Sequence, residues 1–101
     1  MNKYTGLSDF EINKKVAERL LIPHYVIKDK VLNAGNDLVY DPCNNPSDAM
    51  PIIIENKIAM NHPYDIWQCG SGWNVAENKN PLRACMESYL LMKDAENNNG
   101  N

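Results

Sequence analysis

Apolar positions at the start of the chain follow the spacing of an amphipathic helix. Ser8 and Glu11 form a capping box, in which each side chain satisfies a backbone N–H at the beginning of a helix. Pro23 ends the pattern, because a proline disfavours the helical conformation of the residue before it. The sequence therefore predicts a helix between Ser8 and Pro23, with an inward face made by Phe10, Ile12, Val16, Ala17 and Leu20.

A second amphipathic pattern lies near the end of the chain. Asn80 and Pro81 supply an N-cap followed by proline at the first helical position. One helical stripe then comprises Leu82, Cys85, Met86, Tyr89, Leu90 and Lys93. This stripe predicts a helix over residues 81–93 with one buried face. The polar residues 94–101 predict a disordered tail.

Short β-prone runs lie between these two helices. Residues 25–27 and 31–32 are compatible with a hairpin or with one bent strand. Residues 66–69 predict another strand, and the glycine-rich turn at residues 70–72 returns the chain to a partner strand at residues 73–76. Because the loops between successive strands are short, we expect antiparallel pairing.

The segment from Tyr40 to Pro51 is rich in proline, asparagine and aspartate. Asn45 reads as an N-cap before a proline at the first helical position. Pro51 is expected to stop this helix after about one turn, because proline lacks the N–H that a helix interior requires. The branched run Ile52–Ile54 then predicts a strand covered on both faces, in a hairpin with residues 58–60.

These elements predict an α+β domain. A small antiparallel sheet is packed by two amphipathic helices, one N-terminal and one C-terminal, and a short central helical turn completes the fold. We expect a single domain over residues 1–93, followed by the polar tail at residues 94–101. The pattern leaves the order of the strands open.

Composition narrows the classes of function. The formal net charge is −3 and the ten basic residues form no stripe, which argues against nonspecific nucleic-acid binding. Three cysteines at wide spacing favour reduced thiols over a disulfide scaffold. No leader pattern and no long apolar run occur, so we expect a soluble intracellular protein that does not enter a membrane.

The sequence lacks the spacing of a metal site or a catalytic constellation. Cys43, His62, Cys69 and His24 include no closely spaced ligand pair, so we expect neither a metal nor a cofactor. Cys43 precedes a helix start, where a thiolate would be favoured, but no histidine is near it in sequence. We therefore expect a protein that is not an enzyme, with a small hydrolase using Cys43 as the weaker alternative.

Two tryptophans flank the predicted turn at residues 70–72. If the strands pair, the rings of Trp67 and Trp73 lie near each other. Packing in the core or across strands is favoured, because large aromatic side chains are usually buried. The alternative is a stacking platform for a base or a nucleotide.

A second group of candidate binding residues surrounds the central segment. Arg83 lies in the first turn of a helix, where the dipole disfavours a cation, so we expect it to pair with Asp41 or Asp48. A bound anion is the functional alternative. A pocket at the helix start, with Arg83 opposite, would be lined by Asp41, Cys43, Asn44 and Asn45. The same residues are equally compatible with a purely structural corner.

Three strings in this order resemble the NinX family of small proteins from lambdoid phages and prophages. They are residues 7–17, residues 41–58 and residues 80–84, and the resemblance covers most of residues 7–93. It is weakest over residues 21–38. The chain departs from the family pattern at Met50, where tryptophan is common, at Cys85, where alanine is common, and at Glu87 and Ser88, which interrupt a usually apolar helix.

The resemblance implies an accessory protein of the phage early region and brings no catalytic residues to this chain. We expect a non-enzymatic binder of a host or phage protein, or of a small nucleotide signal, that modulates host physiology or defence. The alternative is a nucleic-acid-associated factor in recombination or replication, which predicts salt-sensitive binding. A homodimer is expected if Tyr89, Leu90 or Met92 proves exposed.

Overall fold

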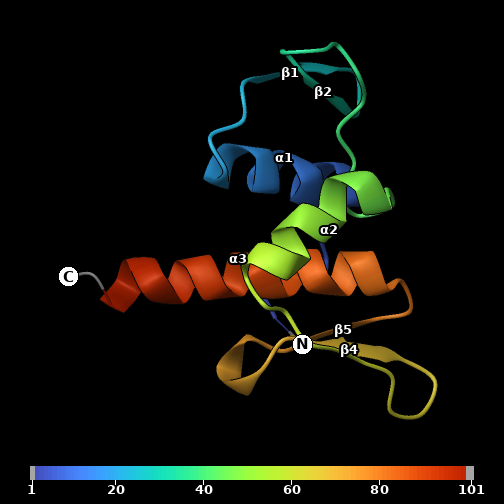
Figure 1. The fold of residues 1–101 in the computed structure, drawn as a ribbon, viewed down its shortest axis with the longest axis vertical. Helices are drawn as coiled ribbons and strands as arrows, with labels where there is room; N and C mark the ends of the chain where they lie inside the picture. Colours follow the sequence, from blue (N-terminus) through green and yellow to red (C-terminus); the bar gives the residue numbers. More distant parts are fainter. Residues whose placement is uncertain (1, 100–101) are drawn as a thin grey trace.

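The computed structural model describes residues 2–99, with side chains through residue 97, as an α+β fold (Figure 1). The described part contains three α-helices and two small antiparallel sheets, which confirms the predicted fold class. The helices are α1 (Asp9–Arg19), α2 (Pro46–Glu55) and α3 (Pro81–Asn99). The strands are β1 (His24–Ile27), β2 (Lys30–Asn33), β3 (Met60–Asn61), β4 (Trp67–Cys69) and β5 (Ala76–Asn78), and a 3₁₀ helix, η1, spans Gly72–Asn74.

Helix α3 lies in the middle of the molecule. Helices α1 and α2 pack on one side of it, and the three-stranded sheet packs on the other (Figure 1). For this reason residues 83–90 are buried all round, instead of along the single predicted stripe. The prediction of a disordered tail from residue 94 is wrong for residues 94–99, which continue α3. Residues 100 and 101 of that predicted tail lie outside the described residues.

Helix α1 begins as the sequence predicts. The backbone N–H of Glu11 donates to Ser8 Oγ across 3.1 Å, and the N–H of Ser8 donates to the Glu11 carboxylate across 3.1 Å. The helix ends at Arg19, and Leu21 then adopts a left-handed conformation before Pro23. The inward face contains the predicted apolar residues and also a buried asparagine, Asn13.

Strands β1 and β2 form a hairpin, which settles the choice between a hairpin and a bent strand. Tyr25 lies opposite Leu32, and Ile27 lies opposite Lys30. Val39 adds an isolated antiparallel bridge to Leu32 on the other side of β2. The hairpin stands at one end of the molecule, above α1 (Figure 1).

The central helix is longer than predicted. Pro51 lies inside α2, and the expected strand over residues 52–54 is wrong, as is its hairpin with residues 58–60. Ala49, Ile52 and Ile53 are buried, while Ile54 is exposed. This i, i+3, i+4 spacing is that of a helical stripe, and its burial against α3 outweighs the helix bond that proline cannot make.

The second sheet has the order β3-β4-β5, with both pairs antiparallel. A partner for the strand at Trp67 exists, but it begins at Ala76, later than predicted, because η1 occupies the chain before it. Trp67 therefore lies opposite Asn78, and the expected proximity of Trp67 and Trp73 does not occur. Among residues 2–99, no helix is both long and apolar enough to cross a membrane.

Candidate functional site

Arg83 is held in an ion-pair cluster beneath the start of α1. Its Nη1 donates to Asp9 across 2.7 Å and its Nε donates to Glu87 across 2.7 Å. Nη2 donates to the backbone carbonyls of Tyr4 and Leu7. Burial alone would lower the pKa of Arg83, but the hydrogen bonds to the two carboxylates raise it above its ordinary value. The expected salt bridge exists, with Asp9 and Glu87 in place of Asp41 or Asp48.

A network of asparagines and aspartates ties together the starts of all three helices. From α1, Asn13 donates to Asp41 across 2.7 Å and accepts from the N–H of Cys43 across 3.0 Å. From the start of α3, Asn80 donates to the carbonyl of Cys43 across 2.7 Å and to Asn44 across 3.0 Å. The segment before α2 is thereby fixed against both neighbouring helices.

The remaining residues of the central segment also have structural partners. Asn45 caps α2 by accepting from the N–H of Ser47, and Asp48 accepts from the N–H of Asp41. Cys43 is fully buried, and this burial, with the nearby charge of Asp9 as the next cause, raises the pKa of its thiol. A raised pKa disfavours the thiolate that nucleophilic catalysis requires. Among the described side chains, no buried nitrogen or oxygen lacks a partner.

A groove of about 500 Å³ lies beside this network, between α1 and β2. Of the predicted pocket residues, only Asp41 and Asn44 line it, whereas Arg83 is buried behind Asp9. The full lining comprises Ser8, Asp9, Phe10, Asn13, Asp29, Lys30, Val31, Val39, Tyr40, Asp41 and Asn44. The floor of the groove is occupied by structural contacts, because its polar side chains already bond to one another or to Arg83. These side chains are Asp9, Asn13, Asp41 and Asn44.

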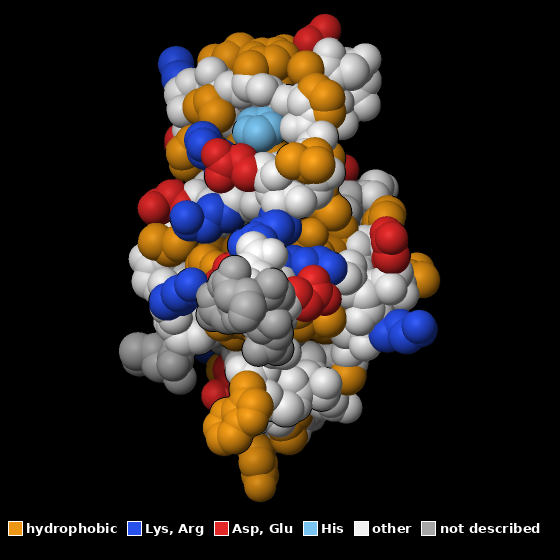
Figure 2. Space-filling view, turned by 90° about the vertical axis from the view of Figure 1, so that its left-hand side faces the viewer, with side chains coloured by type: hydrophobic (Ala, Val, Ile, Leu, Met, Phe, Trp, Pro, Cys, Tyr) orange, Lys and Arg blue, Asp and Glu red, His pale blue; other side chains and the backbone are white. Residues whose placement is uncertain are grey.

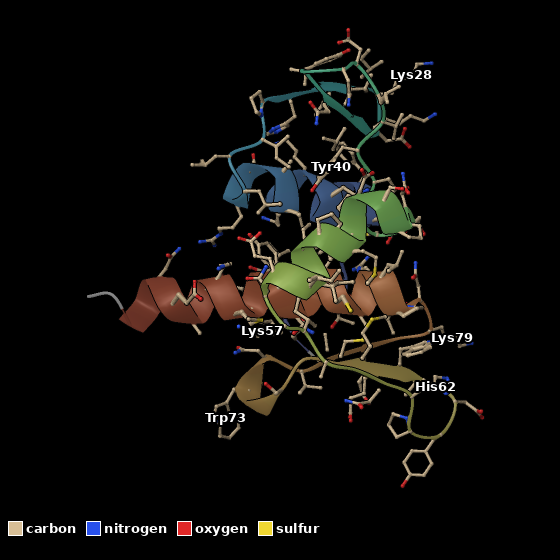
Figure 3. All side chains as sticks on the ribbon, viewed as in Figure 1. Lys28, Tyr40, Lys57, His62, Trp73 and Lys79 are labelled. Carbon is tan, nitrogen blue, oxygen red and sulfur yellow. The ribbon has the colours of Figure 1, made fainter. Side chains whose placement is uncertain are left out.

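The two tryptophans have opposite environments. Trp67 is half-buried against the core, and its ring lies 4.9 Å from that of His62, tilted by 54°. Trp73 is 99% exposed, so the expectation of core packing is wrong for this residue. It lies on η1 and projects away from the body of the protein (Figure 3).

The turn that carries Trp73 is fastened to α3. The hydroxyl of Ser88, which is fully buried, donates to the carbonyl of Asn74 across 2.6 Å. Gly70, with φ +97°, leaves room for this contact, since a Cβ there would lie 2.2 Å from Ser88 Oγ. The exposure of Trp73 is therefore set by the fold, and Ser88 is the structural residue that sequence reasoning treated only as an interruption of the helix.

Tyr64 is a further exposed aromatic residue, which sequence reasoning missed. It lies in the loop between β3 and β4, is 94% exposed, and adopts a left-handed backbone with φ 64°. This loop lies on the same side of α3 as η1 (Figure 1). A left-handed conformation is uncommon for a bulky residue and marks a position that merits attention. The sequence signal for the exposure of Tyr64 was its position in the polar loop after β3.

A family model described as Bacteriophage P22, NinX matches residues 3–93. The chain belongs to this family. The match confirms the resemblance seen in the sequence and extends it to the residues before α1. No curated protein and no solved structure matches the chain.

The family match covers the hydrogen-bond network, both sheets and all of the helices except residues 94–99 of α3. In this NinX-family chain the three family-like strings fall on most of α1, on the segment leading into α2 together with α2 itself, and on the start of α3. The hydrogen-bond network joins these same three places. The strings by which the family is recognised thus include the residues that assemble the helices, whereas Trp73 lies between the second and third strings.

Among the described residues, no group of three or more histidine, cysteine, aspartate or glutamate side chains is arranged to hold a metal ion. Cys69 and Cys85 are buried free thiols at the interface of β4 and α3. The Cys69 Sγ contacts the carbonyl of Pro81 at 3.8 Å. These thiols of the NinX-family chain belong to the core packing.

Proposed function

We propose that this NinX-family chain is a non-enzymatic phage accessory protein that binds a partner protein in the host cytoplasm and modulates its activity. The contact residue in this proposal is Trp73, at the end of the molecule that we call the aromatic end; the ring pair of His62 and Trp67 lies at the other side of the same end (Figure 3). The observation that carries the proposal is the 99% exposure of Trp73 on a turn fastened to α3.

Displaying an indole in water is energetically unfavourable. Burying a large apolar side chain is worth about 1.5–3 kcal/mol relative to leaving it exposed. A flexible loop would allow such a ring to fold back on the protein, but the bond from Ser88 to Asn74 holds η1 in place. A preorganised tryptophan is well suited to a partner, because tryptophan is enriched among the residues that dominate interface energies.

A protein partner fits the aromatic end better than a nucleic acid does. An exposed Trp73 offers a stacking face for a base, which is the specific feature that favours the second candidate, a nucleic-acid-associated factor. However, the chain has a formal net charge of −3, so phosphate backbones gain no general attraction to it. The same charge disfavours a small nucleotide signal as the ligand.

The test is affinity capture from infected host cells with the wild type, Trp73→Ala and Ile54→Ala. Ile54 is a matched control because it is a large apolar residue of α2 that is 68% exposed. The proposal predicts a protein retained by the wild type and by Ile54→Ala, but lost with Trp73→Ala. Mass spectrometry of the eluate for nucleotides and nucleic acid distinguishes the other ligand classes, and a set of retained proteins identical for all three baits contradicts the proposal.

A further inference from the structure

Helix α3 directs its apolar side chains into the molecule. Tyr89 and Leu90 are buried and Met92 is half-buried, so these residues lack the exposure that would have indicated a homodimer. On the side that faces the three-stranded sheet, the helix packs against β4 and β5. Cys85 of α3 and Cys69 of β4 are both fully buried there. This contact between helix and sheet therefore contains two free thiols.

The backbones of β4 and α3 come very close at the end of β4. A Cβ placed on Gly70, the residue after Cys69, would lie 3.1 Å from Ser88 Cβ and 2.2 Å from Ser88 Oγ. Two Cβ atoms joined by a disulfide are about 3.8 Å apart. At this point the strand and the helix therefore already lie within the spacing that a disulfide requires.

The thiols of Cys69 and Cys85 meet over the first turn of α3. The Cys69 Sγ contacts the carbonyl of Pro81 at 3.8 Å. Cys85 follows Pro81 by four residues and precedes Ser88 by three, so all three lie on one face of the helix. A helical side chain leans toward the N-terminus, so the Cys85 thiol covers the turn that holds this carbonyl. The two thiols share a hydrogen bond, which lowers the pKa of Cys69 and, together with burial, raises the pKa of Cys85.

The chain between the two cysteines carries Trp73. Residues 70–84 include η1, β5 and the start of α3. Hydrophobic side chains project from the end of the molecule where η1 lies (Figure 2). A covalent link between Cys69 and Cys85 would close this segment into a loop, and closing a loop stabilises the native state by restricting the unfolded chain.

We propose that Cys69 and Cys85 form a reversible intramolecular disulfide, which locks the Trp73 turn onto α3 when the protein meets a peroxide. In a reducing compartment both thiols are free, as they are in the structure. The regulatory consequence rests on the proposed function, in which Trp73 is the contact residue, because oxidation fixes this residue in its binding position. Formation of the disulfide itself depends on no partner.

The oxidation is balanced by one molecule of hydrogen peroxide. The Cys69 thiolate attacks one peroxide oxygen, the O–O bond breaks, and the leaving hydroxide takes up the thiol proton as water, which gives a sulfenic acid. The Cys85 sulfur then attacks the Cys69 sulfur, the S–O bond breaks, and the hydroxide leaves with the Cys85 proton as a second water. Two thiols thus lose two electrons and two protons to the peroxide. Cys69 reacts first, because its pKa is the lower of the two.

Because both thiols are buried, the peroxide enters through local opening of the sheet. Strands β3, β4 and β5 are two, three and three residues long. Short strands at the surface open locally far more often than the whole protein unfolds. Hydrogen peroxide is close to water in size, so a small opening admits it.

The test treats the wild type with hydrogen peroxide, alkylates the remaining thiols in denaturant and maps linked peptides by mass spectrometry. We expect a disulfide between Cys69 and Cys85 that also forms in Cys43→Ala, is absent from Cys85→Ala and is reversed by dithiothreitol. Ile54→Cys, at a position that is 68% exposed, verifies that the dose oxidises an accessible thiol. A pair that stays reduced at that dose, a link that involves Cys43, or sulfinic acid in place of the disulfide overturns the proposal.

Amide hydrogen exchange tests the locking of the turn. The N–H of Asn74 donates to the carbonyl of Ser71 across η1. We expect exchange of this N–H to slow at least tenfold in the oxidised protein and to be unaffected by peroxide in Cys85→Ala. Unaltered exchange in a protein with the mapped disulfide overturns the locking. Trp73→Ala forms the same disulfide, so failure of this inference is distinguishable from failure of the proposed function.

Discussion

The hydroxyl of Ser88, in the middle of α3, donates a 2.6 Å hydrogen bond to the backbone carbonyl of Asn74. This one contact links the central helix of the fold to the turn that displays Trp73. The packing that stabilises the protein therefore also determines which aromatic residue faces solvent. Substitutions that loosen this link are therefore expected to affect both stability and binding.

Removing the Ser88 hydroxyl tests the link directly. Ser88→Ala leaves the carbonyl of Asn74 without its donor, and we expect a loss of ~1–3 kcal/mol in the free energy of unfolding. Chemical denaturation measures this loss. Ser71→Ala is the control, because Ser71 is exposed and its side chain makes no capping bond to η1. Equal stability of the two variants would show that the Ser88 contact is unimportant.

The two glycines of this turn are expected to differ in their tolerance of a side chain. In Gly70→Ala the new Cβ would meet Ser88 Oγ at 2.2 Å on a positive-φ backbone, and we expect a destabilisation of about 3 kcal/mol or more. Gly72 also has a positive φ but has open space around it, so Gly72→Ala should cost only ~1–2 kcal/mol. Comparing the two thermal midpoints isolates the steric contact, and the reverse order would contradict it.

Arg83 should be among the residues whose loss is most costly. Arg83→Met leaves Glu87, which is 1% exposed, as an uncompensated buried carboxylate, and we expect a loss of about 3–5 kcal/mol. The double variant Arg83→Met with Glu87→Met should recover much of this loss. For comparison, Lys14→Met removes the exposed ion pair with Glu18 and should cost less than about 1 kcal/mol. Denaturant unfolding of the four proteins checks this order, and a double variant no more stable than Arg83→Met would refute it.

The carboxylate of Asp94 gives the protein an acid-sensitive contribution to stability. Burial alone would raise the pKa of Asp94, but hydrogen bonds from Tyr4 and Lys3 and the charge of Arg19 hold it below its ordinary value. The contribution is complete above the unfolded pKa of about 4 and is lost as the pH falls through the lower folded value. Asp94→Asn should therefore be less stable than the wild type near neutral pH, with a difference that shrinks in acid.

The measurement is denaturant unfolding of both proteins at neutral pH and at a pH of about 3. Glu96→Gln is the control, because Glu96 is more exposed than Asp94 and pairs only with Lys93 among the described ion pairs. A stability difference between Asp94→Asn and the wild type that is independent of pH would assign the effect to packing instead of charge.

The parts of the fold that could be predicted are those with local signals. The capping box of Ser8 and Glu11 and the Asn80 cap define helix starts by contacts within a few residues, and both are present. Helix α2 was mispredicted because Pro51 is a local signal for ending a helix. The burial of Ile52 and Ile53 against α3, which keeps the helix going, depends on tertiary packing that local reasoning does not supply.

In the candidate site, too, local signals were predictable from the sequence and tertiary contacts were not. A partner for Arg83 was predictable from its unfavourable position near a helix N-terminus. The identity of the partners was not, because Asp9 reaches Arg83 only once α1 docks on α3. The exposure of Trp73 was also out of reach. It depends on the hydrogen bond that Ser88 donates to the carbonyl of Asn74, and these two residues belong to different predicted elements.

We propose Trp73 as the main anchor for a partner protein. The most direct test is the dissociation constant of the captured partner for the wild type and for Trp73→Ala, with Ile54→Ala as the control and circular dichroism to verify folding. An interface anchor is worth at least about 2 kcal/mol, so we predict that binding to Trp73→Ala is weakened roughly 30-fold, while Ile54→Ala binds as the wild type does. Wild-type affinity in a folded Trp73→Ala would contradict the claim.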